Sequence, residues 1–332
     1  MQNITGNDLN TTVTSGIFEA LGMNHSSFME TPSTGGVIPV DAATSGWDGV
    51  MGIDSPGGSV YMSTGDIVKA GQAMLQSTLL TPAQTRRWFK PLIQTGHQGN
   101  AVGAPWEITY LESSNGRLNQ YYTKQGDLGA YHSAIVLSPD YEIGWVVLAA
   151  GAPLANTPVI RETLMSAFDT IVMPAVEKQA KLEAVTNFNG TYFDTATNSS
   201  VTLSVGEGNG TGIGIVEVVS RGVQLVGPES PFVALYGAGT GGRLYPSQLK
   251  TVSKKGSDRD GTYTSRLGFR AVYFPASEEG TINDPCLNGW ASMGAPIYGQ
   301  RTLDDWVFEL GEEGKADAVD FRLLRIKMQR QD

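Results

Sequence analysis

A serine followed three residues later by a lysine can do chemistry, because a nearby amine can activate the hydroxyl as a nucleophile. The chain contains this spacing at Ser247-Gln248-Leu249-Lys250. The segment follows Pro246 in a polar, basic stretch, so we favour a solvated surface segment over a nucleophile there. A Ser-x-Asn sequence occurs at Ser113-Ser114-Asn115, but it lies between two predicted strands, where turn formation explains the same residues.

Metal and cofactor motifs are weak in this sequence. His25, His97 and His132 stand far apart and lack the spacing of metal ligands, so we expect no metal site. Residues 237–242 match the G-x-G-x-x-G pattern, but Arg243-Leu244-Tyr245-Pro246 follows in place of the helix that a dinucleotide site needs. We therefore expect no cofactor.

Caps and apolar spacing predict four helices in the first half of the chain. One runs from Asp8 to Leu21 and ends at Gly22, and two more begin with capping boxes at Ser63 and Thr81. A long helix begins at Thr157, and a kink is expected at its proline, Pro174. The apolar positions expected to face inward on this helix are Ile160, Leu164, Phe168, Ile171 and Ala175.

Strands dominate between residues 106 and 150. Trp106–Glu112 and Leu118–Lys124 are predicted to form a hairpin, because Asn-Gly in the linker 113–116 is a strong turn signal. His132–Leu137 and Ile143–Ala150 are two further strands. Their nearly continuous apolar character predicts a sheet that is covered on both faces.

After about Leu182, Gly, Thr, Val and Tyr dominate, and no periodic run of helix length interrupts the predicted strands. This pattern predicts an all-β barrel or sandwich, so we place a domain boundary between residues 183 and 184 and assign the chain to the α+β class. The strands expected here are Val201–Val205, Gly214–Val219, Gly222–Val226, Thr262–Tyr273, Trp306–Leu310 and Val319–Ile326.

The charge of the chain limits its partners. The 332 residues carry a net charge of −10, which argues against nucleic acid or an anionic membrane as a partner. No run approaches 18 apolar residues, so no transmembrane helix is expected. Residues 1–30 lack the basic and apolar regions of a signal peptide, and we expect none in this stretch.

N-x-Ser/Thr acceptors nevertheless favour secretion with N-glycosylation, although a Thr-rich composition can also produce them. The single Cys286 excludes an internal disulfide. It suggests either a partner outside the chain or a buried, inert thiol. The acceptors are Asn3, Asn10, Asn24, Asn189, Asn198 and Asn209.

Four phrases, in order, resemble the serine β-lactamase and penicillin-binding-protein superfamily, on its class C and esterase side. The resemblance covers roughly residues 3–180. The β-rich remainder resembles, more loosely, the extra C-terminal domain of fungal secreted β-lactamase-like proteins. The four phrases are Leu21-Gly22-Met23 with Ser27-Phe28 and Pro32; Ser55-Pro56-Gly57-Gly58 with Ser63-Thr64 and Asp66; Gly103-Ala104-Pro105-Trp106-Glu107; and Lys124-Gln125-Gly126 with Gly129-Ala130-Tyr131-His132-Ser133.

The resemblance implies that residues 1–183 form part of a large antiparallel sheet flanked by helices. It also implies that Lys124-Gln125-Gly126 replaces the family's Lys-Thr-Gly strand. Lys124 would attract a substrate carboxylate or favour the ionised form of a neighbouring hydroxyl. Gly126 would leave room for an extended substrate, and the amide of Asp127 would donate to an oxyanion.

Other positions near this strand have weaker implied roles. Gln125 stands where the family has a hydroxyl residue, and it is expected to bind substrate together with Tyr131 and Trp47. Asp127 adds an acid that could neutralise Lys124. For His132 we favour a half-buried structural role over a catalytic base.

The family's Ser-x-x-Lys and Tyr-x-Asn elements would lie upstream of Met1. We therefore expect an N-terminally truncated part of a secreted serine hydrolase that acts on a small-molecule ester, amide or β-lactam, with the missing N-terminal half as its structural partner. Losing a nucleophile costs on the order of a millionfold in rate, so the chain alone is predicted to be inactive. The alternative is a non-catalytic secreted glycoprotein whose β domain binds or scaffolds.

A truncated domain should expose apolar surface that its missing part would cover. We expect such a face over the helix 160–176 or over a group of strand residues. Those strand residues are Ile135, Val136, Val146 and Leu148.

Overall fold

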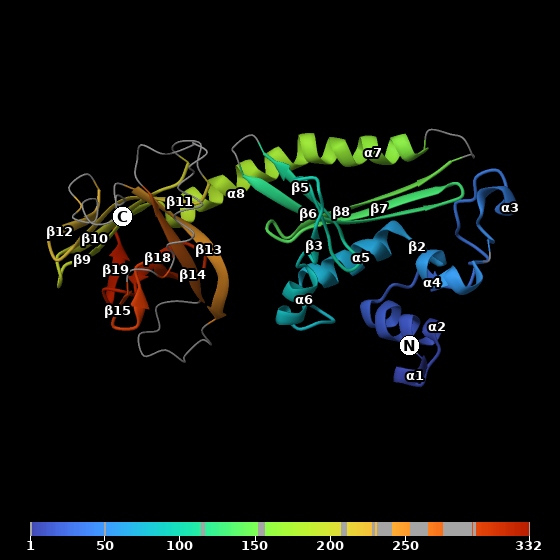
Figure 1. Ribbon diagram of the computed structural model, residues 1–332, viewed down its shortest axis with the longest axis horizontal. Coiled ribbons are helices and arrows are strands. Elements are labelled where there is room, and N and C mark those ends of the chain that lie inside the picture. The colour runs from blue at the N-terminus through green and yellow to red at the C-terminus, as the bar shows by residue number, and fades with distance from the viewer. Residues whose placement is uncertain are drawn as a thin grey trace. The chain divides into compact units, whose positions relative to one another are not determined.

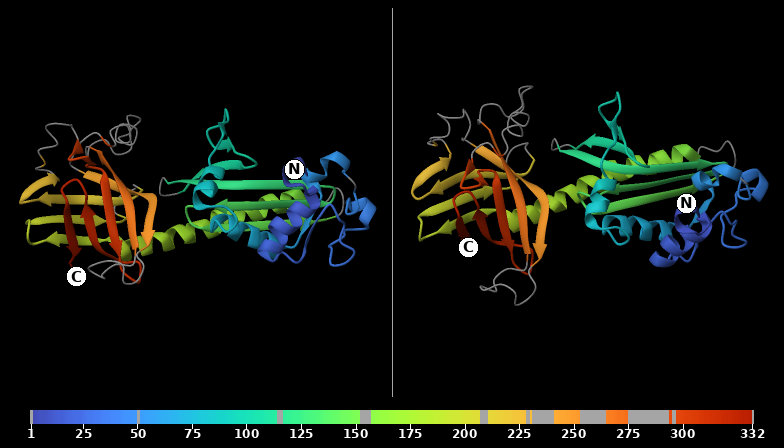
Figure 2. Two further views of the ribbon diagram at one scale, coloured as in Figure 1. Left: turned by 90° about the horizontal axis from the view of Figure 1, so that it is seen from below. Right: turned by 60° about the horizontal axis from the view of Figure 1, so that its bottom comes forward.

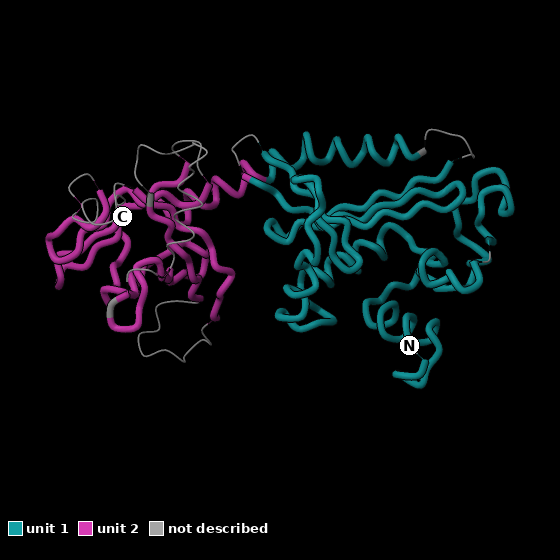
Figure 3. Tube along the Cα trace, viewed as in Figure 1, with its two compact units in different colours: residues 1–114, 118–176 teal, residues 115–117, 177–332 magenta. Residues whose placement is uncertain are grey.

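The computed structural model of the chain describes residues 2–49, 51–113, 117–151, 157–206, 211–227, 230, 241–252, 265–274, 294 and 297–331. The chain divides into two compact units, one of residues 1–114 and 118–176 and the other of residues 115–117 and 177–332 (Figure 3). The division at 176/177 falls inside a helix. The domain boundary between residues 183 and 184 stays a prediction.

Unit 1 is built on one antiparallel sheet whose six described strands are neighbours in chain order. The pairing of Glu112 with Leu118 confirms the predicted hairpin, although residues 114–116 lie outside the described residues. One strand, β6, continues to Leu128 instead of ending at Lys124. The strands are β3 (Ile93–Gln94), β4 (Asn100–Val102), β5 (Glu107–Glu112), β6 (Leu118–Leu128), β7 (Tyr131–Ser138) and β8 (Ile143–Ala150).

Helices cover both faces of this sheet, as the apolar strands predict (Figure 1). On one face, α5 (Thr64–Leu75) and α6 (Pro82–Trp88) enclose a core that includes Phe89 and Trp106. The complete capping box at Thr81 begins α6, as expected. On the other face lies α7 (Thr157–Ala167), where a second core includes Val136.

The helix that begins with α7 continues through a π-helical turn, η3 (Phe168–Val172), into α8 (Met173–Phe188). The π-helical turn ends two residues before Pro174. The kink expected at Pro174 stays a prediction. The predicted inward face is wrong for four of its five positions. The side chains of Ile160, Leu164 and Ile171 are 51%, 51% and 69% exposed, respectively, and Ala175 is exposed as well.

Phe168 faces the sheet as predicted, together with residues outside the predicted set. Phe168 stacks on Trp145 of β8 with ring centroids 3.9 Å apart, and Arg161 and Met173 are buried. The helix is therefore rotated so that an arginine points inward and an apolar stripe points outward. Apolar periodicity alone could not indicate this rotation, because the inward position 161 carries a charge.

The N-terminal segment forms a small core of its own. Asp8 caps α2 (Leu9–Val13), which continues into π-helical η1 (Thr14–Glu19). Gly22, with φ +64°, follows the helix as predicted. Phe18, Met23 and Phe28 pack together here. The remaining short elements of unit 1 are α1 (Gln2–Thr5), β1 (Ser26–Phe28), α3 (Ala42–Ser45), η2 (Gly52–Asp54), α4 (Ser55–Gly58) and β2 (Val60–Met62), and β1 pairs with β2.

The capping box predicted at Ser63 is only half formed. The Ser63 hydroxyl accepts the Asp66 N–H at 3.2 Å, but the buried Asp66 carboxylate does not reach back to the cap. It accepts the His25 N–H at 2.7 Å and the Ser26 hydroxyl at 2.9 Å instead. Asp66 therefore fastens β1 to the start of α5.

The strands of unit 2, which follow the end of α8, form a β-barrel, one of the two predicted architectures (Figure 2). Eight strands close into a ring because β10 pairs with both β9 and β11. The ninth strand, β12, pairs with the last residues of β11, beyond those that pair with β13. Trp306, Phe308 and Phe321 fill its interior. The nine strands are β9 (Gly190–Asp194), β10 (Ser199–Ser204), β11 (Ile213–Ser220), β12 (Val223–Val226), β13 (Gly241–Val252), β14 (Ser265–Phe274), β17 (Asp305–Leu310), β18 (Ala316–Phe321) and β19 (Ile326–Arg330). A separate pair of short strands is formed by β15 (Ile297–Tyr298) and β16 (Arg301–Thr302).

Several details of the β prediction are wrong. The predicted strand Val319–Ile326 is a hairpin, because the chain turns between β18 and β19, with Arg325 at φ +56°. The strands β9, β13, β15 and β16 were not predicted.

Candidate functional site

The lysine strand has one open edge. Strand β5 begins at Glu107, opposite Thr123, so β6 beyond Thr123 pairs with β7 alone among the described strands. The N–H of Gln125 points to the open edge, where it donates to the Glu107 carboxylate at 3.1 Å. Alternate residues of a strand direct their N–H groups to the same side, so the N–H of Asp127 points to this edge as well.

Side-chain alternation separates the predicted site residues into two groups. Lys124 and Gly126 share a face with Tyr131 and with Ile135, which lies against Gly71 of α5. The other group is on the α7 face and consists of Gln125, Asp127 and His132. The side chain of Gln125 therefore lies on the opposite face of the sheet from that of Lys124. The substrate-binding role of Gln125 stays a prediction.

The carboxylate that engages Lys124 belongs to Glu107, not to Asp127. The Lys124 ammonium contacts Glu107 Oε1 and donates to the carbonyl of Gln125 at 3.0 Å. The expectation that Asp127 neutralises Lys124 is therefore wrong. The register of the β5–β6 hairpin could have indicated the contact between Glu107 and Lys124. A turn at 113–116 pairs Glu107 with Thr123, the residue before Lys124.

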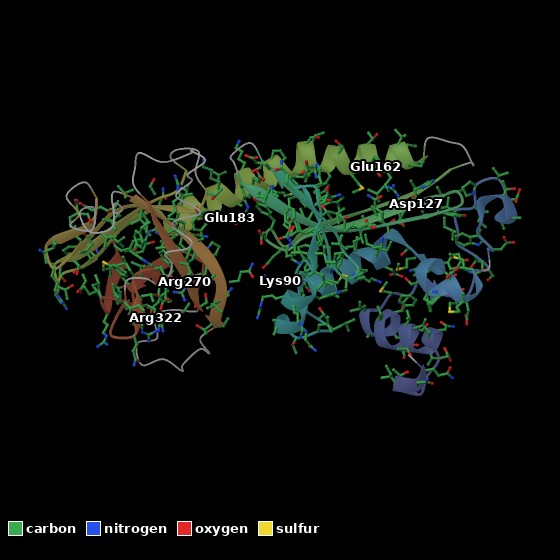
Figure 4. The ribbon with its side chains drawn as sticks, viewed as in Figure 1. Lys90, Asp127, Glu162, Glu183, Arg270 and Arg322 are labelled. Atoms are coloured by element: carbon green, nitrogen blue, oxygen red, sulfur yellow. The ribbon has the colours of Figure 1, made fainter. Side chains whose placement is uncertain are left out.

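Asp127 belongs instead to a charge cluster under α7. Its Oδ1 accepts from His132 Nδ1 and from Arg161 Nη1, and Arg161 also bonds Glu162 at 2.8 Å. Figure 4 labels Asp127 and Glu162 in this region. Burial alone would raise the pKa of Asp127, but the hydrogen bond from His132 and the charge of Arg161 lower it. The sequence prediction missed Arg161.

Aromatic rings lie near the turn that joins β6 to β7. Trp47, which follows α3, contacts Tyr131 with ring centroids 5.7 Å apart and Tyr61 with centroids 4.9 Å apart. The Tyr61 hydroxyl donates to the carbonyl of Trp47 at 2.7 Å, and the Tyr131 hydroxyl donates to the carbonyl of Val37 at 3.0 Å. The structure therefore brings the predicted residues Trp47 and Tyr131 together.

Gly129 allows the α3 segment to pack closely on the turn between β6 and β7. Gly129 has φ +57°, and a Cβ there would lie 2.3 Å from the carbonyl oxygen of Ser45. The N–H of Ala130 donates to the same carbonyl at 2.9 Å. At Gly126, a Cβ would lie 2.8 Å from the Ser133 hydroxyl. Both glycines therefore permit close packing around the strand that carries Lys124.

The Ser-x-x-Lys sequence at 247–250 lies on β13, not on a helix. The Ser247 hydroxyl donates to the carbonyl of Gly268 at 2.9 Å, and Gln248 has φ +60° at an irregularity in the β13–β14 pairing. A helical turn that would place the serine and lysine side chains on one face is not formed there. Residues Gly241–Val252, which include the end of the G-x-G-x-x-G pattern, are likewise strand.

Other sequence features fall on exposed, half-buried or undescribed positions. Asn3, Asn24 and Asn198 are exposed, Asn10 and Asn189 are half-buried, and Asn209 and Cys286 lie outside the described residues. In the described parts of the chain, no group of three or more His, Cys, Asp or Glu residues could hold a metal ion. None of the helices found there is both long enough and apolar enough to cross a membrane.

The two units define an α+β domain on an antiparallel sheet, followed by a β-barrel. A sequence model of the beta-lactamase family matches residues 1–167, so the chain belongs to the beta-lactamase family. A second model, described as the beta-lactamase-like-like C-terminal domain, matches residues 180–332.

Curated relatives are longer than this chain. A beta-lactamase-like protein of Arthroderma benhamiae is 28% identical over 190 residues, which are 55% of this chain and 31% of that protein. The probable hydrolase M10 of a Phoma species is 28% identical over 236 residues, 68% of this chain and 37% of that protein. The chain therefore spans about a third of the length of these relatives.

Similarity to solved structures is weaker. An octameric penicillin-binding protein homologue from Pyrococcus abyssi is 13% identical, with a TM-score of 0.39 over 98% of this chain and 61% of that one. A class C beta-lactamase is 15% identical, with a TM-score of 0.33 over 47% of this chain and 50% of that one. The family assignment therefore depends on the sequence match.

Proposed function

We propose that the chain supplies the lysine-strand side of a serine acyl-transfer site that acts on a small-molecule ester, amide or β-lactam. The open edge of β6 carries the proposal, because the Lys124 side chain, the small Gly126 and the N–H of Asp127 follow one another along it. A fixed N–H donor at such an edge stabilises the oxyanion of a tetrahedral intermediate. The relatives named as probable hydrolases agree with this function.

In this proposal each residue has a distinct role. The Lys124 ammonium assists a hydroxyl or an anionic group of the substrate, and the N–H of Asp127 donates to the oxyanion. Trp47 and Tyr131 bind the apolar part of the substrate. The charge cluster with Arg161 and His132 holds Asp127 in place from the opposite face.

The attacking oxygen, in this proposal, comes from protein outside the chain. The hydrogen bonds of the Lys124 ammonium among the described residues go to Glu107 and to the Gln125 carbonyl, neither of which is a nucleophile. Without that oxygen, residual binding and oxyanion donors leave only about a thousandfold of catalysis over water. We therefore expect the chain alone to be inactive toward esters, amides and β-lactams.

Two surfaces of unit 1 support a structural partner that is a further segment of the same longer protein. Strand β8 ends the described sheet, and its eight residues, Ile143–Ala150, contain no charge or proline to protect the edge. On α7 and η3, Ile160, Leu164 and Ile171 form an exposed apolar stripe. Because the chain spans about a third of its relatives, we propose that a strand and a helix from the remaining part cover these surfaces.

Covalent labelling tests the function directly. The longer protein that contains this chain should react with a fluorophosphonate or a fluorescent penicillin, and the chain alone should not. Lys124→Met in the longer protein should reduce the labelling rate by about a hundredfold or more, as expected for a catalytic amine. Lys90→Met, which removes an exposed lysine elsewhere in unit 1, is the matched control. Absence of labelling in the longer protein would contradict the proposal.

Secretion and N-glycosylation are part of the same proposal. The exposed acceptors Asn3, Asn24 and Asn198 are the positions where an attached glycan would meet the least hindrance. In a secreting eukaryotic host, glycosidase treatment should reduce the mass, and peptide mass spectrometry should locate glycans at these positions. An unmodified secreted protein, or one retained in the cell, would contradict this part.

A further inference from the structure

A short apolar segment, residues 37–40, lies beside the turn that joins β6 to β7. The side chains of Val37, Ile38 and Val40 are 71%, 42% and 71% exposed, respectively. Val40 also has φ +68°, a conformation that is rare for a β-branched residue and that is found mostly at functional sites. Single exposed apolar residues are ordinary, but a group of them indicates a binding surface.

The segment is held in place along its length. The Tyr131 hydroxyl donates to the carbonyl of Val37 at 3.0 Å. The backbone of Gly36 lies against the Trp47 ring, because a Cβ at Gly36 would be only 2.3 Å from Cζ2 of that ring. At the other end, the Asp41 side chain caps α3. A surface that is already ordered loses little conformational entropy when a ligand binds.

The segment lies where an acyl chain that follows β6 would meet it. Tyr131 pairs with Leu128, and both share with Lys124 the α5 face of the sheet. A strand rises about 3.4 Å per residue, which places this pair about 7 Å along β6 from Gly126. A catalytic amine acts on the attacking or the leaving oxygen, so the acyl chain extends away from Lys124, toward Tyr131 and residues 37–40.

The charges around the segment favour a neutral apolar ligand over a lipid surface. No Lys, Arg or His occurs between His25 and Lys69. Glu30, Asp41 and Asp48, on either side of residues 37–40, are exposed acids. Acids without neighbouring basic residues are repelled by anionic lipid, whereas a neutral alkyl chain meets no charged residue within residues 31–40.

We propose that residues 37–40 bind the acyl chain of the substrate, so that the site takes an ester or amide with a long apolar acyl chain in preference to an acetyl group. This inference rests on the proposed function for the reacting acyl group, and it adds the part of the substrate that the segment recognises. Contact with an alkyl chain would remove apolar surface of Val37, Ile38 and Val40 from water, which is the favourable term in such binding.

Binding of octanamide to the chain itself is the first test, because every residue named above lies in the chain. In a ¹H–¹³C spectrum, octanamide should shift the methyl signals of Val37, Ile38 and Val40 in a saturable way. It should bind at least about tenfold more tightly than acetamide, since only octanamide has an alkyl chain long enough to bury these side chains. Equal binding of the two amides, or no saturable shift at these methyl groups, would overturn the proposal.

Two substitutions remove the apolar surface and spare the contacts that hold the segment. Val37→Ser keeps the backbone carbonyl that accepts from Tyr131, and Val40→Asn introduces a residue that tolerates positive φ. The double variant should bind octanamide about tenfold more weakly. The matched control is Leu92→Ser, which removes a side chain that is 68% exposed next to β3 and should leave octanamide binding unchanged. A loss in the control as large as that in the double variant would overturn the proposal.

A lipid surface is the competing occupant, and sedimentation with phosphatidylcholine vesicles tests it. The proposal expects the chain to stay in solution. Sedimentation with the vesicles that is lost in the double variant would assign residues 37–40 to a membrane and would overturn the proposal.

Substrate preference in the longer protein is the second test. The ratio of kcat/KM for p-nitrophenyl octanoate to kcat/KM for p-nitrophenyl acetate should fall about tenfold in the double variant. An unchanged ratio would overturn the proposal. A fall seen only for octyl acetate, whose long chain is on the alcohol, would assign the segment to the leaving group and would also overturn it. Turnover of none of these esters would count against the proposed function, while the octanamide titration would still decide whether the segment binds an alkyl chain.

Discussion

Lys124 and Asp127 are three residues apart, yet they act on opposite faces of the sheet. Strand alternation sends Lys124 toward the α5 face and Asp127 toward α7, where Arg161 is buried. A sequence motif names both residues but does not say which charges they meet. At the scale of single residues, Glu107 neutralises the charge of Lys124, and Arg161 fixes the position of Asp127.

The Asp127 cluster should make stability depend on pH in acid. The pKa of Asp127 in the folded protein is lower than its ordinary value of 3.8, so its ionised form stabilises the fold above that value. This contribution is lost as the pH falls through the folded-state pKa. Since half of the Asp127 side chain is exposed, we expect Asp127→Asn to cost about 1 kcal/mol at pH 7.

Urea unfolding of Asp127→Asn and the original chain at several pH values measures this effect. The difference in free energy of unfolding should shrink as the pH falls below about 4, where Asp127 becomes protonated. A difference that keeps growing below about pH 4 would show that the ionised form of Asp127 does not stabilise the fold.

Gly129 should tolerate alanine poorly. Gly129→Ala combines a positive φ with a Cβ placed 2.3 Å from the Ser45 carbonyl oxygen, so the α3 segment would have to move. We expect a loss of about 2–4 kcal/mol. Gly35 also has a positive φ, but a Cβ there would meet nothing within 4 Å.

Gly35→Ala is therefore the matched control, and it should cost only about 1 kcal/mol. Thermal unfolding of the two variants separates the cost of backbone conformation from that of the contact with Ser45. Equal losses would mean that the contact between the Ser45 carbonyl and the β6–β7 turn does not contribute to the loss of stability in Gly129→Ala.

At the scale of elements, the sequence predicted the positions of helices and strands better than their orientations. The positions of β5 to β8 were predicted nearly in full. The Asn-Gly turn signal indicated the β5–β6 hairpin, and continuous apolar runs indicated strands that are buried on both faces. The long helix was predicted in place, but of its five predicted inward positions only Phe168 faces the sheet. Its rotation is set also by the contact of the buried Arg161 with Asp127, and apolar periodicity cannot indicate that a charged residue faces inward.

The outward stripe on that helix gives a prediction about assembly. Leu164→Lys together with Ile171→Lys should leave the unfolding free energy of the chain nearly unchanged, because both side chains are more than half exposed. In the longer protein the same pair should prevent the remaining segment from packing. Co-purification of the two parts, expressed separately, measures this association.

Ser166→Lys adds a charge at an exposed position away from the stripe and is the control for that experiment. It should leave co-purification intact. If the stripe variant also retains the other part, the segment does not pack against α7.

At the scale of the whole molecule, the two units differ in how completely they are closed. The barrel of unit 2 leaves no free edge in its ring of described strands, whereas the sheet of unit 1 ends at β8. The composition shift near Leu182 indicated two regions, and short strands indicated a barrel or sandwich. Closure itself could not be predicted, since it depends on pairing between strands distant in sequence, such as β9 and β19.

Unit 2 should therefore fold without unit 1. Arg330 donates to the carbonyl of Asn187 at 2.9 Å, and Phe188 packs on Phe269 and Phe308, so the end of α8 belongs to the barrel. A fragment of residues 177–332 should show a β-type circular dichroism spectrum and a single cooperative unfolding transition. A broad transition without tertiary signal would contradict this independence.

The ring is closed by the pairing of Phe193 with Gln329 and of Tyr192 with Arg330. The first strand of the barrel, β9, can therefore complete its pairing only after the last strand, β19, has been synthesised. The residues of β19 leave the ribosome after those of β9 through β18. The nascent barrel must therefore remain open until β19 has emerged. A protein cut before Ile326 would keep all the other strands, but its ring would be unsealed.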